Sequence, residues 1–198
     1  MHPDLTPPPA EALLFDWDGT LVDSVEANYR AMSRAVSAVG LDLGKEWFFS
    51  RTGISSAEMI ELLVREQGVT PAASLDDIVA TRDMFFREEA DGITAHAAVL
   101  EVVEAAHGGT PMAIASGGSR AIILDTLRRL PFRDAFDAIV TRDDVARGKP
   151  APDIFRHAAA ALSADPAGCV VYEDSDEGIA AAHAAGMRVI DVRPYTGR

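Results

Sequence analysis

Two carboxylates directly behind an apolar run are the feature that most limits the fold of this chain. The run Ala12–Phe15 is typical of a buried strand, and the segment Asp16-Trp17-Asp18-Gly19-Thr20 follows it at once. Ligands of open α/β sheets bind at the carboxyl ends of the strands. A carboxylate at that edge acts as a nucleophile or holds a hard cation, and a second one two positions on is placed to handle a proton. The alternative is an ordinary Asp-Gly turn, and partners elsewhere in the chain decide between the two.

The length and charge of the chain narrow its possible partners. A chain of 198 residues holds one domain, or a domain with a modest insertion. The formal net charge is −13, which argues against nucleic acid and anionic membranes as partners, since both require a basic surface. A site for an anionic substrate must therefore create its own positive field from a metal ion, a lysine or backbone amides.

The sequence predicts a cytoplasmic protein with no evident membrane span or protein partner. Its single cysteine, Cys169, rules out an internal disulfide, and the apolar neighbours Val170 and Val171 indicate a buried strand thiol. No run approaches the ~18 apolar residues that a membrane span requires. Residues 1–9 lack the positive charge and the apolar run of a signal peptide, so we expect them to form a disordered lead-in.

The order of the expected helices and strands indicates an α/β fold with an insertion. Residues 24–91 carry helical spacing, including a capping-box pattern at Ser55 and Glu58, and no convincing strand. From Ile93 onward, short apolar strands alternate with helices, which is typical of a parallel sheet with right-handed crossovers. We therefore predict a Rossmann-like parallel sheet core, residues 10–23 and 92–198, with an α-helical cap, residues 24–91, inserted after the first strand.

Four polar clusters fall at the carboxyl ends of the expected strands or at the head of a helix, and these ends share one edge of a parallel sheet. The clusters are Asp16 with Asp18, the segment Ser116-Gly117-Gly118, Lys149, and Glu173 with Asp174. Phosphoryl transfer needs such a set: an in-line nucleophile, cations around the phosphate oxygens and a proton donor for the leaving oxygen. The sequence therefore predicts a phosphoryl-transfer site.

Each cluster has an expected role in that chemistry. Asp16 would attack phosphorus, and Asp18 would protonate the leaving alkoxide and then activate water. Mg²⁺ would be held by Asp16, Asp174 and a backbone carbonyl near Asp18. The segment Ser116-Gly117-Gly118 would bind phosphate oxygens through its hydroxyl and its backbone amides. Lys149 would add a point charge, and its role is favoured because only two of the 18 basic residues are lysines.

These four motifs resemble those of the haloacid dehalogenase-like (HAD) superfamily. The resemblance runs from about Ala12 to Val192. It implies a Rossmann-like core, a Mg²⁺ cofactor and an aspartyl-phosphate intermediate on Asp16, with Asp174 binding the metal directly and Glu173 acting behind it or through water. The helical insertion resembles the small cap of the β-phosphoglucomutase-like branch, whose members include sugar phosphatases such as fructose-1-phosphate phosphatases.

Departures from the patterns of these relatives favour a phosphatase. Halogen-removing relatives lack the second Asp, here Asp18, and phosphonate-cleaving relatives need a cap lysine at an offset that Lys45 does not have. True β-phosphoglucomutases carry a His at the position of Asn28 and an Arg at that of Ser56. Arg51 lies near enough in the sequence to replace that Arg, so a phosphosugar mutase remains the alternative.

The cap is expected to select the substrate, because a lid over a charged site excludes water and contacts the leaving group. The expected specificity residues are Asn28, Arg51, Gly53, Ile54 and Ser55. The small cap suits a small phosphorylated metabolite, such as a sugar or polyol phosphate. A non-catalytic Mg²⁺-binding or phosphoacceptor domain is the alternative of another class. The second Asp of the first motif argues against it, because a proton-handling group promotes turnover.

Overall fold

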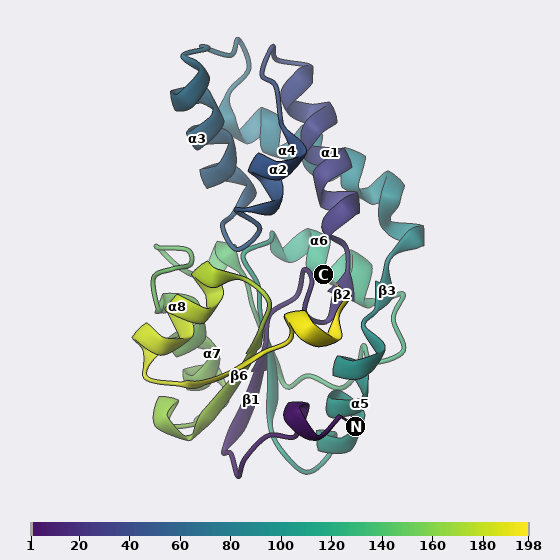
Figure 1. Ribbon diagram of the computed structural model, residues 1–198, viewed down its shortest axis with the longest axis vertical. Helices are drawn as coiled ribbons and strands as arrows, with labels where there is room; N and C mark the ends of the chain where they lie inside the picture. Colours follow the sequence, from purple (N-terminus) through teal and green to yellow (C-terminus); the bar gives the residue numbers. More distant parts are fainter. Residues whose placement is uncertain (1, 198) are drawn as a thin grey trace.

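The computed structural model of the protein describes residues 2–197 and contains a five-stranded parallel sheet in the order β5-β4-β1-β6-β7 (Figure 1). The strands are β1 (Ala12–Phe15), β4 (Met112–Ala115), β5 (Ala138–Val140), β6 (Cys169–Glu173) and β7 (Arg188–Asp191). β1 lies at the centre and pairs in parallel with β4 and β6. The predicted α/β fold is confirmed, and the strand that carries Asp16 and Asp18 occupies the middle of the sheet.

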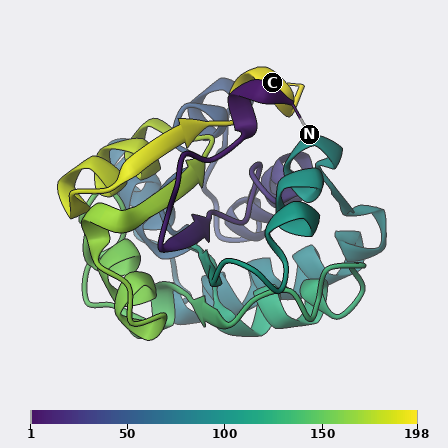
Figure 2. The ribbon, with the colours of Figure 1, turned by 90° about the horizontal axis from the view of Figure 1, so that it is seen from below.

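Both faces of the sheet are buried, which explains why its strands are continuous apolar runs. On β1, Leu13 and Phe15 face one cluster of buried residues, whereas Ala12 and Leu14 face another. The first cluster contains residues from α5 (Ala97–Ala106) and α6 (Arg120–Leu127), and the second contains residues from α7 (Asp153–Ala161) and α8 (Asp176–Ala185). Figure 2 shows the sheet edge-on between these two layers.

Four helices form a separate unit beyond the carboxyl ends of the strands (Figure 1). They are α1 (Val25–Ser37), α2 (Lys45–Phe49), α3 (Ser56–Gln67) and α4 (Leu75–Glu89), and we call them the cap. The cap has its own apolar cluster, with Met32, Phe48 and Ile60 among its buried members. The capping box at Ser55 and Glu58 is present at the start of α3. We propose that the cap domain spans residues 24–91 and that the core comprises residues 10–23 and 92–198.

The two chain segments that join the cap to the core are paired with each other. β2 (Val22–Asp23) and β3 (Thr94–Ala95) are antiparallel, with Val22 opposite Ala95 and Asp23 opposite Thr94. Neither strand was expected from the sequence, because two residues are too few to show a period of two.

The N-terminal segment differs from the sequence-based expectation. Residue 1 lies outside the described part of the chain, but the disordered lead-in expected over the following residues is wrong. Pro3–Leu5 form a 3₁₀ helix, Leu5 is fully buried, and the Tyr172 hydroxyl donates to the Leu5 carbonyl at 2.8 Å. Proline suits the start of such a helix, and Leu5 joins the apolar cluster of the core. None of the helices over residues 2–197 is both long enough and apolar enough to cross a membrane.

Candidate active site

A buried lysine joins two of the predicted clusters at the end of the central strand. Lys149 Nζ lies 2.5 Å from Asp16 Oδ1 and 2.6 Å from Glu173 Oε1, and its side chain is 1% exposed. Burial alone would lower the pKa of Lys149, but the carboxylates of Asp16 and Glu173 raise it above its ordinary value. The ammonium group therefore stays charged and supplies the positive field that this acidic chain otherwise lacks.

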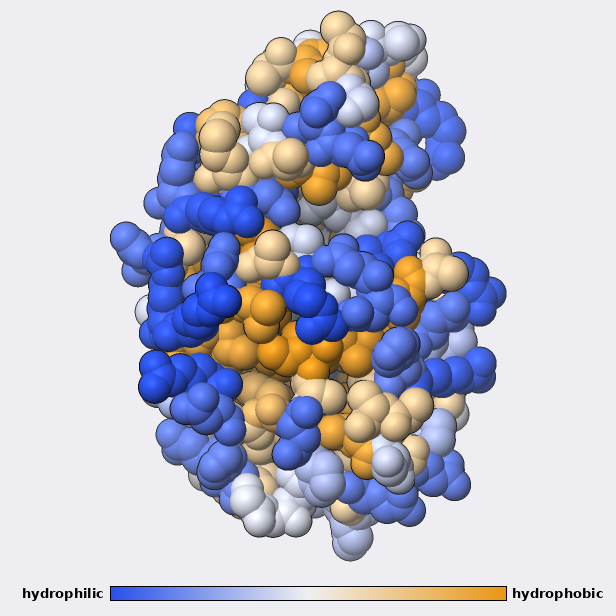
Figure 3. All heavy atoms as spheres, turned by 180° about the vertical axis from the view of Figure 1, so that it is seen from behind, coloured by the Kyte–Doolittle hydropathy of each residue, from blue (hydrophilic) through white to orange (hydrophobic). Residues whose placement is uncertain are grey.

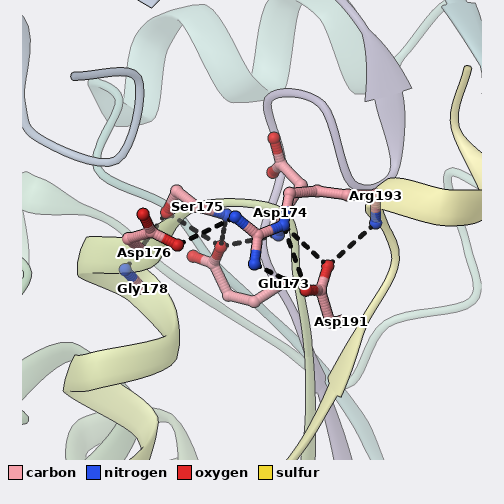
Figure 4. Close-up of polar contacts among 7 residues, drawn as sticks. All are labelled: Glu173, Asp174, Ser175, Asp176, Gly178, Asp191 and Arg193. Atoms are coloured by element: carbon pink, nitrogen blue, oxygen red, sulfur yellow. Dashed lines mark hydrogen bonds and ion pairs between the residues drawn. The ribbon is translucent and has the colours of Figure 1, made fainter. Parts of the chain in front are cut away.

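Glu173 organises the loop that follows β6 (Figure 4). Its Oε2 accepts hydrogen bonds from the backbone amides of Asp174 and Ser175, each at 2.7 Å, and from Ser175 Oγ at 2.9 Å. Gly178 makes room for this carboxylate, since a Cβ at that position would lie 1.7 Å from Glu173 Oε1. Both oxygens of Glu173 are thus occupied by donors, so its role is to hold Lys149 and the loop.

Arg193 fastens the same loop from the outside (Figure 4). Its guanidinium pairs with Asp176 at 2.8 Å and with Asp191 Oδ2 at 2.6 Å, and hydrogen bonds from Arg193 lower the pKa of Asp191. Asp176 is the first residue of α8, and Asp191 ends β7. The pairs therefore join the start of α8 to the neighbouring strand, beside the loop that carries Asp174.

The carboxylates at this edge fit a divalent cation. Asp16, Glu173 and Asp174 are all buried, and each offers an oxygen within 4.8 Å of the others. Burial raises the pKa of Asp16 well above its ordinary value; Lys149 opposes the shift, and Glu173 and Asp174 add to it. Three carboxylates against one ammonium group leave an excess of negative charge, and a hard dication with oxygen ligands neutralises it. Asp16 and Asp174 stay the predicted residues that would hold Mg²⁺; Asp174 Oδ1 also accepts a hydrogen bond from Thr20 Oγ1 at 2.9 Å.

Asp18 has a different environment from Asp16. Its Oδ1 accepts hydrogen bonds from Asn28 Nδ2 at 2.7 Å and from the Ser24 hydroxyl. Its side chain is not part of the carboxylate cluster of Asp16, Glu173 and Asp174, and a role of its backbone carbonyl as a metal ligand stays a prediction. The Asp18 carboxylate is therefore oriented by two polar donors, and its expected acid–base role stays a prediction.

The predicted phosphate loop follows β4. Ser116 is buried, and its Oγ accepts a hydrogen bond from the Gly118 amide at 3.0 Å. Gly117 and Gly118 line a cavity together with Asp16 and Asp18. A Cβ at Gly118 would lie 3.8 Å from Asp18 Oδ2, so this loop comes close to the predicted proton donor. The structure thus brings all four polar clusters to one edge of the sheet.

The cap closes over this cavity, whose volume is about 50 Å³. One water needs about 10–15 Å³, so the space beneath the cap holds only a few waters. A phosphorylated sugar has more than a dozen non-hydrogen atoms, and we expect movement of the cap to make room for a substrate of that size.

The predicted cap residues divide into two groups. Asn28, Gly53 and Ile54 line the cavity. Arg51 does not: its guanidinium stacks on the Trp47 ring at 4.3 Å and donates to the Trp47 carbonyl. Ser55 is also absent from the lining, because its hydroxyl caps α3. The backbone N of Ser55 would lie 4.0 Å from a Cβ at Gly117, and roles of Arg51 and Ser55 in substrate selection stay predictions.

The sequence analysis missed one lining residue, Arg82 in α4. Its side chain is 8% exposed, stacks on the Phe86 ring at 4.7 Å, and pairs with Asp83 at 2.9 Å. Its Nε is buried without a hydrogen-bond partner. Ile78, Arg82 and Phe86 are the buried residues of α4, spaced four apart. An arginine within an apolar stripe was the signal that could have identified it.

Comparison with known proteins decides the family. The profile described as haloacid dehalogenase-like hydrolase matches residues 13–192. The chain belongs to this family. Fructose-1-phosphate phosphatase YqaB of Escherichia coli is 33% identical to this HAD-family chain over 184 residues, which cover 91% of this chain and 95% of YqaB. The β-phosphoglucomutase of Bacillus subtilis is 28% identical over 189 residues, covering 92% and 83% of the two chains.

A solved structure supports the same relationship. The crystal structure of CbbY from Rhodobacter sphaeroides in complex with phosphate superposes on this HAD-family chain with a TM-score of 0.81 and 31% identity. The match covers 91% of this chain and 84% of CbbY. These findings confirm the resemblance to the HAD superfamily, the Rossmann-like fold, and the prediction of an enzyme that hydrolyses phosphoric monoesters.

Proposed function

We propose that this HAD-family chain is a Mg²⁺-dependent phosphatase of a small sugar or polyol phosphate, and that it acts through an aspartyl-phosphate intermediate on Asp16. The observation that carries the proposal is the buried cluster of Asp16, Lys149, Glu173 and Asp174, which adjoins the closed cavity where Asp18 lies. The relatives named above include a sugar phosphatase, which agrees with this substrate class.

In the first step, the Asp16 carboxylate attacks phosphorus while the ester P–O bond breaks, and Asp18 gives its proton to the leaving alkoxide. Asp18, now ionised, takes a proton from water, which attacks the aspartyl phosphate and releases inorganic phosphate and free Asp16. Lys149 holds Asp16 in place, and the Ser116-Gly117-Gly118 loop binds the phosphate oxygens. Mg²⁺ held by Asp16 and Asp174 would reduce the repulsion between the attacking carboxylate and the anionic phosphate.

The cap supplies contacts for the rest of the substrate. Asn28 and Arg82 offer polar groups, whereas Phe48 and Met59 offer apolar surface. A phosphorylated sugar or polyol combines these requirements, because its phosphate binds to the core and its hydroxyl groups accept hydrogen bonds from the cap.

Phosphate release from a panel of sugar phosphates, polyol phosphates and phosphoglycolate tests the proposal, with Mg²⁺ or with EDTA. We expect Mg²⁺-dependent release that Asp16→Asn lowers by at least about 10³-fold, since the nucleophile is lost. Asp134→Asn is the matched control, because Asp134 is 87% exposed and its ion pair is with Arg133, which does not belong to the carboxylate cluster. Release that Asp16→Asn leaves unchanged would contradict the mechanism.

A phosphosugar mutase is the second candidate, since the β-phosphoglucomutase of B. subtilis is a relative over most of the chain. Isomerisation of β-glucose 1-phosphate with a bisphosphate primer, in the absence of net phosphate release, would favour it. Asn28 argues for hydrolysis, because it donates to Asp18 and occupies the place of the mutase histidine. We also propose a cytoplasmic location, and the lack of nucleic-acid, membrane and protein partners stays a prediction.

A further inference from the structure

Asp83 in α4 links the cap to the core through a single carboxylate. Its Oδ1 accepts a hydrogen bond from Arg82 Nη1 at 2.9 Å, and its Oδ2 accepts one from Ser119 Oγ at 3.0 Å. The Asp83 side chain is 14% exposed. The two hydrogen bonds are thus largely shielded from water, where bonds to a charged acceptor are stronger than at the surface.

Ser119 gives up its ordinary local role to make this contact. It is the N-cap residue of α6, and a serine there normally accepts a hydrogen bond from its own helix. The Ser119 side chain makes no such bond. The Arg120 amide at the helix start is satisfied instead by Asp143 Oδ2 at 2.8 Å. The hydroxyl of Ser119 therefore bonds Asp83 of the cap domain instead of its own helix. Ser119 directly follows the predicted phosphate loop, residues 116–118.

Arg82 needs such an anchor. Arg82 lines the cavity, and Asp83 is its one charged partner among the ion pairs of the described residues. The Nε atom has no hydrogen-bond partner. A buried arginine with hydrogen-bonding capacity left over at a cavity is ready for a polar group of a ligand, provided its direction is fixed.

Two further ion pairs join α4 and the segment that follows it to α6 and the segment that follows α6, and both are more exposed than the contact of Asp83 with Ser119. Arg87 pairs with Asp125 at 3.1 Å, and Asp91 pairs with Arg129. All four of these side chains are at least 40% exposed. In Figure 3 hydrophilic residues lie along the boundary between cap and core on the rear face. The contact between Asp83 and Ser119 is therefore the shielded member of this series and the one beside the site.

We propose that Asp83 is a positioning residue that couples cap closure to the placement of Arg82: Ser119 of the core holds Asp83 in the closed state, and Asp83 then holds the Arg82 guanidinium at the cavity. When the cap opens, Asp83 loses Ser119 and Arg82 loses its fixed direction. The polar part of the substrate is thus recognised only after the phosphate loop and the cap have met.

The kinetic test uses Ser119→Ala, and it rests on the proposed phosphatase function. We expect KM for the best substrate to rise about tenfold with kcat changed less than twofold, because the lost hydrogen bond to a charged group is made in both the bound ground state and the transition state. Ser119→Thr keeps the hydroxyl and should restore KM to within about threefold. In the Asp83→Ala background, Ser119→Ala should have no further effect. Asp125→Asn, which removes an exposed contact between the same helices, is the matched control.

A distance measurement tests the inference without turnover. Spin labels are attached to Arg65→Cys on the cap and Ala160→Cys on the core, both at exposed positions, while Cys169 is buried. Inorganic phosphate with Mg²⁺ is the probe for closure. We expect it to shift the label distance of the parent protein, and Ser119→Ala to need about tenfold more phosphate for the same shift.

The outcomes separate the two proposals. A distance shift that needs more phosphate in Ser119→Ala, with no hydrolysis of any tested ester, would support the coupling and count against the phosphatase. Equal phosphate dependence in the parent and Ser119→Ala, or no shift in either, would overturn the coupling. So would a fall in Tm of several degrees in Ser119→Ala with unchanged KM, because that pattern belongs to an ordinary helix cap.

Discussion

The close approach of Gly53 to the core makes Gly53→Ala a direct test of cap closure. Gly53 lies in the cap loop between α2 and α3 and lines the cavity. A Cβ at this position would lie 2.5 Å from Ser175 Oγ, 2.9 Å from Ser175 Cβ and 2.9 Å from Glu177 Cβ. Ser175 cannot turn aside without loss, because its hydroxyl bonds Glu173 and caps α8.

The expected magnitude follows from these distances. Side-chain carbons rarely approach other heavy atoms closer than about 3.4 Å, so the cap loop must withdraw by about 1 Å. A displacement of that size at a catalytic site typically costs about 10²-fold in rate. We therefore expect kcat/KM for phosphate release to fall about 100-fold in Gly53→Ala.

The control is Gly44→Ala, also in the cap. A Cβ at Gly44 would meet only Trp47 Cβ, at 3.9 Å, so activity should stay within about twofold of the parent. Steady-state kinetics on the same substrate, with thermal unfolding of both variants, separate closure from stability. Full activity in Gly53→Ala would refute the reasoning, because it would show that the catalytic state does not bring this loop against Ser175.

Three further predictions concern buried groups. Lys149→Met should lower the free energy of unfolding by about 3–5 kcal/mol in urea titrations, since Asp16 and Glu173 lose their buried cation; an unchanged midpoint would contradict this. Burial, with help from Glu11 and Asp165, raises the pKa of the Cys169 thiol to about 11, so a thiol reagent at pH 8 should react more than about 10²-fold more slowly than with a free thiol. Rapid labelling of the native protein would argue against a buried strand thiol. Phe155→Ala in α7 should cost about 3–5 kcal/mol, because the ring is fully buried, and calorimetry would measure the loss.

Much of the catalytic edge could be predicted because parallel strands end on one side of a sheet. Asp16 and Ser116 directly follow apolar runs, and Glu173 with Asp174 follows another, so their convergence depends only on topology. Strand topology could not predict Arg82 as a site residue, because the position of Arg82 depends on how α4 crosses the site before the chain returns to the core. The direction of the Arg51 side chain could not be predicted either, because spacing in an irregular loop does not determine where a long side chain points; here it stacks on Trp47.

The pairing of β2 with β3 has a consequence for how the cap moves. Two independent linkers would let it tilt, twist and slide against the sheet. Here the outgoing and returning segments are hydrogen bonded side by side (Figure 1), so they form one two-stranded ribbon rather than two independent links. We expect the cap to move about this ribbon as a hinge, which would return Arg82, on the helix that leads into β3, to a similar position above the sheet at each closure.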